Sequence, residues 1–254
     1  GIVPRDIQHR QLLGRAIALV IALPVDPAPI DHAATAFVID AAGADAQRVE
    51  LAYEYIGTDA MQLIRHTDAA GEVASEMATQ LIAQEFRPVR GMSDDELMAQ
   101  MVGAIRASNA AIFQRTMSEH DKRGMGTTTT VLSLLPLLYL IGQVGDSRAY
   151  LLRGTVLSQL TKDHSYVQEQ VDAGRLSPEE ARVHPYANVI TRCVGSSGDV
   201  VPDLYLGTLE VGDLILLASD GLTGMLEDEQ VRDVLTMDGD LEQMVDRLIA
   251  DANR

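Results

Sequence analysis

Two aspartates stand at the ends of apolar runs that are typical of buried strands. Asp220 follows the run 214–218 and precedes a glycine, and Asp146 follows Gly145 at the end of the run 137–144. A carboxylate at a strand end can join backbone and solvent oxygens around a hard cation such as Mg²⁺ or Mn²⁺. Taken alone, the Gly-Asp pair at 145–146 and the Asp-Gly pair at 220–221 are each more typical of a turn than of a metal site. The repetition of the layout favours a diffuse site made of oxygen ligands.

Other reactive side chains point to structural roles. His164 stands beside a predicted helix cap, which favours a hydrogen-bonding role over catalysis. Cys193 is flanked by apolar residues and is interpreted as a small buried side chain, because no histidine is singled out as its partner. The segment 124–128 is rich in Gly and Thr, but no lysine follows it, so it is interpreted as a tight turn and not as a phosphate-binding loop. The signatures of serine hydrolases, zincins and dinucleotide enzymes are absent from the sequence.

Composition narrows the classes of partner. The 254 residues include 20 Lys and Arg against 37 Asp and Glu, a net charge of −17, so we expect no nucleic acid partner. The apolar runs 16–24 and 131–144 are shorter than the roughly 18–20 residues of a membrane helix, so no membrane insertion is expected. Residues 1–11 do not resemble a secretory signal. The single cysteine excludes an intrachain disulfide and favours a cytoplasmic location.

Apolar spacing predicts the elements that must position the aspartates. Long helices are expected at 69–86, from a capping box at Ser93 to about residue 117, and around 241–249. Residues 165–188 predict two short helices, capped by Ser165 and Ser177. Short strand-like runs are expected at 127–134, 137–144, 149–152, 156–160 and 214–218. This order predicts an α+β fold with antiparallel sheet, because turns this short exclude a parallel crossover.

Six segments in order resemble the metal-dependent protein serine/threonine phosphatases, the PPM or type 2C family, and most closely its bacterial members. One of them alone would be a weak signal, but six in order over some 150 residues are a strong one. The segments are Ala69-Ala70-Gly71-Glu72-Val73-Ala74-Ser75, Gly124-Met125-Gly126-Thr127-Thr128, Gly145-Asp146-Ser147-Arg148, Leu160-Thr161-Lys162-Asp163-His164, Ile190-Thr191-Arg192-Cys193-Val194-Gly195 and Ser219-Asp220-Gly221-Leu222.

The resemblance implies a fold, an activity and roles for single residues. The fold would be a four-layer α-β-β-α sandwich of two antiparallel sheets flanked by helix pairs. The activity would be hydrolysis of phosphoserine and phosphothreonine by a water activated by two Mn²⁺ or Mg²⁺ ions, with a third ion held more weakly. Asp220 would be a ligand of the core metal pair, Asp146 would hold the third metal, and Arg65 would grip the substrate phosphate. Residues 165–188 would form a flap beside the site. The partners would be phosphorylated proteins and a serine/threonine kinase whose action the enzyme reverses.

The sequence departs from the family pattern at two places. After Arg65 it passes through Asp68 directly into the Ala-Ala-Gly-Glu segment, where the family has roughly two dozen further residues with two or three metal-binding carboxylates. At Arg254 it stops before the family's final aspartate ligand and strand. Either the protein is a noncatalytic pseudophosphatase, or the given sequence omits segments of the full protein. The second explanation is favoured, because losing a central strand would expose sheet edges.

Two expectations concern the departure after Arg65. Asp68 would stand in for a lost carboxylate. Omitted residues would leave a gap in the chain between residues 65 and 71 that one peptide bond cannot span.

A soft domain boundary is expected near Val49. It separates residues 1–48, of unknown role, from a phosphatase domain at 49–254. The strand-like runs 16–23 and 36–39 would make a small accessory domain or extra strands.

Overall fold

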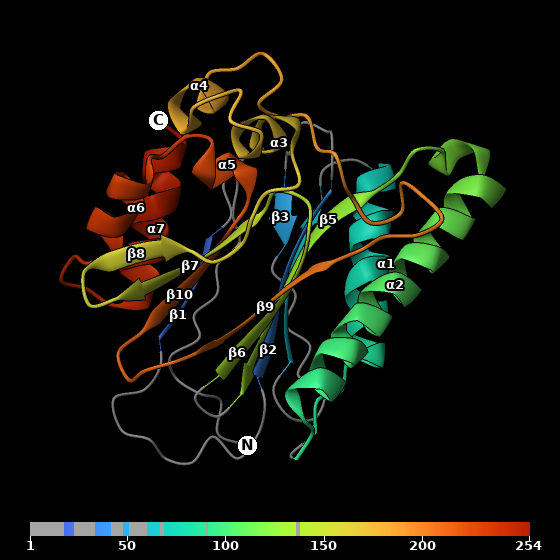
Figure 1. Ribbon diagram of the computed structural model, residues 1–254, viewed down its shortest axis with the longest axis horizontal. Helices are drawn as coiled ribbons and strands as arrows, with labels where there is room; N and C mark the ends of the chain where they lie inside the picture. The colour runs from blue at the N-terminus through green and yellow to red at the C-terminus, as the bar shows by residue number, and fades with distance from the viewer. Residues whose placement is uncertain are drawn as a thin grey trace.

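The structure is a computed structural model, and it describes most of the chain from residue 69 onward together with four earlier strands (Figure 1). The described residues are 18–22, 34–41, 48–50, 60–66, 69–89, 91–135 and 138–254. Side chains are described from Val73 onward within these ranges.

Ten strands form two sheets in the described part of the chain. The six-stranded sheet has the order β3-β4-β2-β5-β6-β9, and the four-stranded sheet has the order β1-β10-β7-β8. The strands are β1 (Ala18–Ala22), β2 (Ala34–Ala41), β3 (Arg48–Glu50), β4 (Ala60–His66), β5 (Thr127–Leu135), β6 (Leu138–Val144), β7 (Arg148–Arg153), β8 (Val156–Gln159), β9 (Asp203–Thr208) and β10 (Leu214–Ala218).

Neighbouring strands run antiparallel except for β2 and β4, which pair in parallel. The chain passes through β3 before it returns as β4, so this connection is long enough for a parallel return. The predicted α+β sandwich of two sheets is confirmed, with this one pair as the local departure from an antiparallel pattern.

Successive side chains of the central strands pack on opposite faces of their sheet. On β5, Val131 packs toward the first pair of helices, while its neighbour Leu132 packs between the sheets. On β10, Leu217 packs between the sheets and Leu216 packs toward the last helices. Successive side chains of a strand point to opposite faces, so a sheet covered on both faces needs apolar residues at nearly every position.

Helices cover the outer face of each sheet (Figure 1). The first pair, α1 (Ala69–Glu85) and α2 (Asp94–Ser118), packs on the six-stranded sheet, and α6 (Asp228–Leu235) and α7 (Leu241–Ala252) pack on the four-stranded sheet. The predicted four-layer arrangement is therefore confirmed.

The predicted capping box at the start of α2 is present. The Ser93 N–H donates to the Glu96 carboxylate at 2.8 Å, and the Ser93 hydroxyl accepts from the Glu96 N–H.

The segment 165–188 forms two short helices, as predicted. The first is α3 (Tyr166–Asp172), capped by Ser165, and the second is α4 (Pro178–Arg182), capped by Ser177. They lie at the end of the sandwich where β10 runs into α5 (Asp220–Thr223) (Figure 1). A single 3₁₀ turn, η1 (His120–Lys122), follows α2. We call residues 165–188 the flap.

Sequence patterns missed several elements, among them β9 and α6, and located two of the four early strands. Strand β9 carries only half-exposed or exposed side chains, and α6 contains four charged residues among its eight, so neither shows a continuous apolar run. The runs 16–23 and 36–39 do contain strands: β1 pairs with β10, and β2 lies between β4 and β5. β1 is thus a member of the four-stranded sheet and β2 a member of the six-stranded sheet. The domain boundary near Val49 stays a prediction.

Within the described ranges, no helix combines the length and apolar character needed to cross a membrane.

Candidate active site

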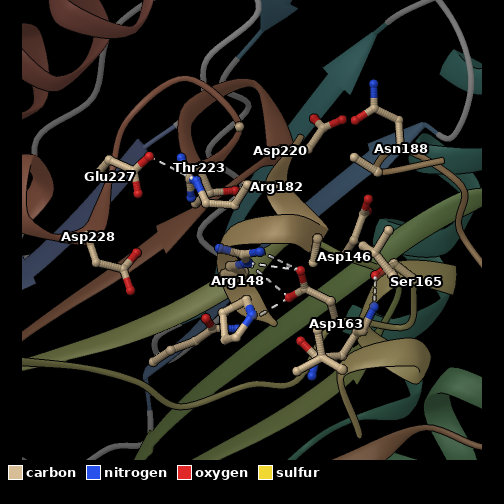
Figure 2. A pocket seen from close by; sticks show the side chains of 18 of the residues that line it. Asp146, Arg148, Asp163, Ser165, Arg182, Asn188, Asp220, Thr223, Glu227 and Asp228 are labelled. Atoms are coloured by element: carbon tan, nitrogen blue, oxygen red, sulfur yellow. Dashed lines mark hydrogen bonds and ion pairs between the residues drawn. The ribbon is translucent and has the colours of Figure 1, made fainter. Parts of the chain in front are cut away.

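A cavity of about 630 Å³ lies between the flap and the body of the sandwich (Figure 2). It is lined by the turn between β6 and β7, the segment leading into the flap, both flap helices, α5 and the start of α6. Acidic side chains dominate its charged lining, namely Asp146, Asp163, Glu179, Asp220, Glu227, Asp228 and Glu229, against Arg148 and Arg182.

Asp146, in the turn that links the two sheets, and Asp220, after β10, line the same cavity. Asp220 is the exposed first residue of α5, directly after the buried strand β10, and Asp146 is half-buried in the turn after β6. Figure 2 shows both carboxylates beside Asn188 on one side of the cavity. The described residues contain no group of three His, Cys, Asp or Glu side chains placed to hold a metal ion. Asp146 and Asp220 are the two sequence-predicted metal ligands that the structure places at this cavity.

The turn that carries Asp146 is held by buried polar side chains. Gly145 has a φ of +110°, and a Cβ there would lie 2.4 Å from the Thr128 methyl carbon, so no other residue fits. The Gln143 side-chain amide donates to the Gly145 carbonyl at 3.1 Å and to the Ser147 carbonyl at 2.6 Å. The backbone on both sides of Asp146 is therefore bound to one buried side chain.

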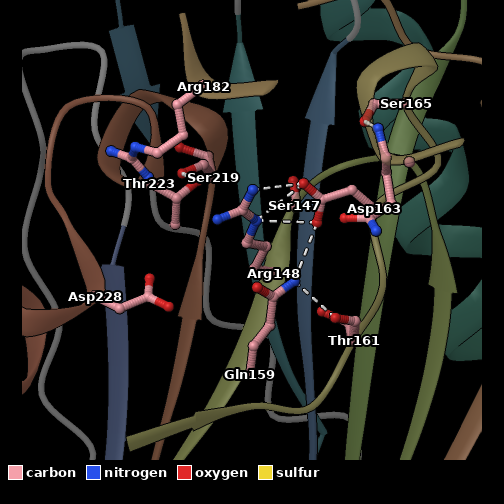
Figure 3. Close-up of polar contacts among 12 residues, drawn as sticks. Ser147, Arg148, Gln159, Thr161, Asp163, Ser165, Arg182, Ser219, Thr223 and Asp228 are labelled. Atoms are coloured by element: carbon pink, nitrogen blue, oxygen red, sulfur yellow. Dashed lines mark hydrogen bonds and ion pairs between the residues drawn. The ribbon is translucent and has the colours of Figure 1, made fainter. Parts of the chain in front are cut away.

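Arg148 and Asp163 form a forked ion pair at the wall of the cavity (Figure 3). Arg148 Nε lies 2.9 Å from Asp163 Oδ1, and its terminal Nη2 lies 2.7 Å from Oδ2. Burial lowers the pKa of Arg148, but the adjacent Asp163 carboxylate outweighs burial and holds that pKa above its usual value. Arg148 therefore keeps its positive charge throughout the neutral range.

A hydrogen-bonded chain continues from this ion pair along β7 to the start of α6. Arg148 Nη1 donates to the Tyr150 hydroxyl at 3.2 Å, and this hydroxyl donates to Asp228 Oδ1 at 3.2 Å. Burial raises the pKa of Tyr150 to about 12, so its hydroxyl stays protonated and available as a donor. Neither Arg148 nor Asp163 was recognisable as a site residue from the sequence, because no local pattern links a strand start to a loop fifteen residues later.

Replacing Arg148 by Met should lower the free energy of unfolding by about 3–5 kcal/mol, because the Asp163 carboxylate, only 8% exposed, loses its partner. Urea denaturation followed by circular dichroism measures the change. Arg232→Met is the matched control, since Arg232 pairs only with the exposed side chains of Glu229 and Asp233. A stability of the Arg148 variant equal to that of the control would show that the fork contributes nothing.

The remaining predicted site residues are placed only in part. Arg65 lies in β4, where its backbone is paired with Val49 of β3. Asp68 lies outside the described residues, and so does the chain link between Asp68 and Ala69 at which a gap was expected. The roles assigned to these two residues therefore stay predictions.

Comparisons with known proteins agree on one family. A family model described as protein phosphatase 2C matches residues 65–253. Protein phosphatase PhpP of Streptococcus pneumoniae is 38% identical over 184 residues, which are 72% of this chain and 74% of that protein. The structure of the Mycobacterium tuberculosis serine/threonine phosphatase PstP/Ppp matches with a TM-score of 0.69 at 32% identity, covering 96% of this chain and 93% of that one. The catalytic domain of PstP in complex with two manganese ions matches with a TM-score of 0.68 at 32% identity, over 87% of this chain and 93% of that one.

Proposed function

Because the chain belongs to the protein phosphatase 2C family and is a serine/threonine protein phosphatase, we propose that it removes phosphate from phosphoserine and phosphothreonine by metal-dependent hydrolysis in the cavity beside the flap. The observation that carries this proposal is that Asp146 and Asp220, which are far apart in the sequence, line one cavity. The noncatalytic alternative has no support, because relatives that are 36–40% identical to this chain are named phosphatases.

The donor chemistry of the two aspartates fits a hard divalent cation. Both are carboxylates at the cavity, and Mn²⁺ and Mg²⁺ prefer oxygen ligands. We propose that Asp220 holds the principal metal pair and Asp146 a third, weaker ion, with Asp68 as a further ligand. When bound, such cations lower the pKa of water and neutralise charge on phosphoryl oxygens. The manganese complex of PstP supports this metal dependence.

The chain's own side chains would bind and orient the substrate. We propose that Arg65 holds the phosphoryl group, because the planar guanidinium donates two parallel hydrogen bonds to phosphate oxygens. Asp220 is exposed to solvent at the end of β10, so a phosphorylated side chain entering from the surface reaches it directly. The flap covers the other side of the cavity and would contact the residues that flank the phosphate.

A phosphothreonine peptide should lose its phosphate when it is incubated with the full protein and Mn²⁺. Released inorganic phosphate, measured by a colorimetric assay over time, gives the rate. The same peptide with unmodified threonine is the control, since it has no phosphate to release. Binding of the phosphopeptide without any release of phosphate would contradict the proposal and restore the noncatalytic reading.

The biological partners follow from the reaction class. We propose that the substrates are phosphorylated proteins and that a bacterial serine/threonine kinase supplies them, since hydrolysis of a phosphate ester consumes what such a kinase makes. The net charge of −17 argues against nucleic acid as a partner. The single cysteine favours a reducing cytoplasm as the place of action.

A further inference from the structure

His164 binds the turn of Asp146 through two reciprocal hydrogen bonds. The His164 backbone N–H donates to the Gly145 carbonyl at 2.8 Å, and the Gly145 N–H donates to His164 Nδ1 at 3.0 Å. The histidine is 6% exposed, so these bonds are shielded from water. Gly145, directly before Asp146, thus has both its backbone groups bound by one residue that comes from the segment leading into the flap.

The hydrogen-bond donors determine which ring nitrogen carries the proton. Because the Gly145 N–H can only donate, Nδ1 must accept, and in the neutral ring the proton then sits on Nε2. That nitrogen lies 3.2 Å from Asp203 Oδ2, to which it donates, and 2.9 Å from Arg192 Nη1, which donates to Asp203 Oδ1 and to the Val201 carbonyl. Burial lowers the pKa of His164, and the nearby Arg192 charge lowers it further against the opposing effect of Asp203, so the ring is neutral at pH 7.

The partner of the ring is itself held in place. Arg192 Nη1 donates to Asp203 Oδ1 at 2.8 Å and to the Val201 carbonyl at 2.8 Å. The His164 carbonyl accepts from the Thr191 N–H at 2.8 Å. The carboxylate of Asp203 at the start of β9 therefore orients the ring, and the ring holds the Asp146 turn.

We propose that His164 is a positioning residue for Asp146: its Nδ1, oriented by Asp203, fixes the Gly145 amide and thereby the direction of the Asp146 carboxylate. The proposal rests on the proposed function for the statement that Asp146 binds a metal ion. His164 contacts no substrate in this role and acts only through the backbone of the turn. Outer groups that orient metal ligands commonly change metal affinity 10- to 100-fold when they are removed.

Two amide variants separate the two ring nitrogens. His164→Asn places an amide oxygen near the position of Nδ1, so it keeps an acceptor for Gly145 and loses the contact with Asp203. His164→Gln places its terminal amide near the position of Nε2, so it keeps a group facing Asp203 and loses the acceptor for Gly145. The two side chains have the same chemistry and differ only in reach.

Hydrogen exchange of the Gly145 amide in the metal-free protein, followed by NMR, is the first measurement. Titration with Mn²⁺ alone, followed by the electron paramagnetic resonance signal of the free ion, is the second. We expect the Gln variant to exchange Gly145 at least about 10-fold faster and to bind the Mn²⁺ held by Asp146 about 10- to 100-fold more weakly. The Asn variant should stay within about threefold of the wild type in both measurements. Equal behaviour of the two variants, whether both are normal or both impaired, would overturn the proposal.

A third variant keeps the test decisive if the Gln variant does not fold. Asp203→Ala leaves Nδ1 in place and removes the carboxylate that orients the ring. Gly145 exchange should therefore become faster and Mn²⁺ affinity weaker, each by a smaller factor than in the Gln variant. Unchanged Gly145 exchange in Asp203→Ala would contradict the orienting role. The exchange measurement uses no metal and no substrate, so its failure counts against this inference alone, whereas a wild-type protein that binds no Mn²⁺ would count against the proposed function.

Discussion

Asp220→Asn will lower turnover of a phosphothreonine peptide by at least about 100-fold, because it removes ligand charge from the proposed metal pair. The fold should survive, since Asp220 is exposed and its backbone carbonyl still accepts from the Gly224 N–H at 2.7 Å. A carboxylate in the first turn of a helix contributes about 0.3–1 kcal/mol, so the stability loss should stay within that range. Phosphate release and urea denaturation of the same preparation measure the two effects.

Two further aspartates provide the comparison for Asp220→Asn. Asp146→Asn should reduce turnover less, because Asp146 would hold the weaker ion. Asp238→Asn removes the same charge from an exposed position between α6 and α7, and it should leave turnover unchanged. If Asp146→Asn and Asp220→Asn behave alike, or if Asp220→Asn unfolds the protein, the assignment of roles is wrong.

Chelation of divalent cations should abolish phosphate release from the full protein. The reason is that the two described carboxylates are oxygen donors, which bind Mn²⁺ or Mg²⁺ reversibly enough for EDTA to remove the ions. Activity is measured before chelation, in excess EDTA, and after Mn²⁺ or Mg²⁺ is restored above the EDTA concentration. Recovery on adding either ion identifies which one supports turnover.

EDTA already saturated with Mn²⁺ is the matched control, since it tests for effects of the chelator itself. It should leave the rate unchanged. A protein that works equally well in excess free EDTA would end the metal hypothesis, while it would leave the serine/threonine phosphatase family assignment, which rests on the sequence match over residues 65–253, untouched.

Local signals in the sequence predicted most of the elements. The start of α2 could be placed at Ser93 because a capping box involves residues only three positions apart. The strand at 214–218 could be placed exactly because its side chains are almost all buried and the run is bounded by turn residues. Such signals are short in range, so they need no knowledge of the fold.

Elements whose stability comes from distant contacts escaped prediction. Among the described strands, the edge strand β9 pairs with β6 alone, and its side chains are at best half-buried, so its own residues carry a weak pattern. The parallel pairing of β2 with β4 likewise depends on which strands become neighbours across the sheet. No window of sequence reports such an arrangement.

The candidate site likewise has residues that the sequence predicted and contacts that only the structure revealed. Asp146 and Asp220 were recognisable from the sequence, because an aspartate beside glycine at the end of an apolar run is a local pattern. Only the tertiary structure showed that Asp163 neutralises Arg148 and that His164 binds Gly145. These contacts form because the packing of the two sheets brings the turn after β6 against the segment leading into the flap. A hydrogen bond needs two atoms within about 3 Å, and that distance is set by packing and not by separation along the chain.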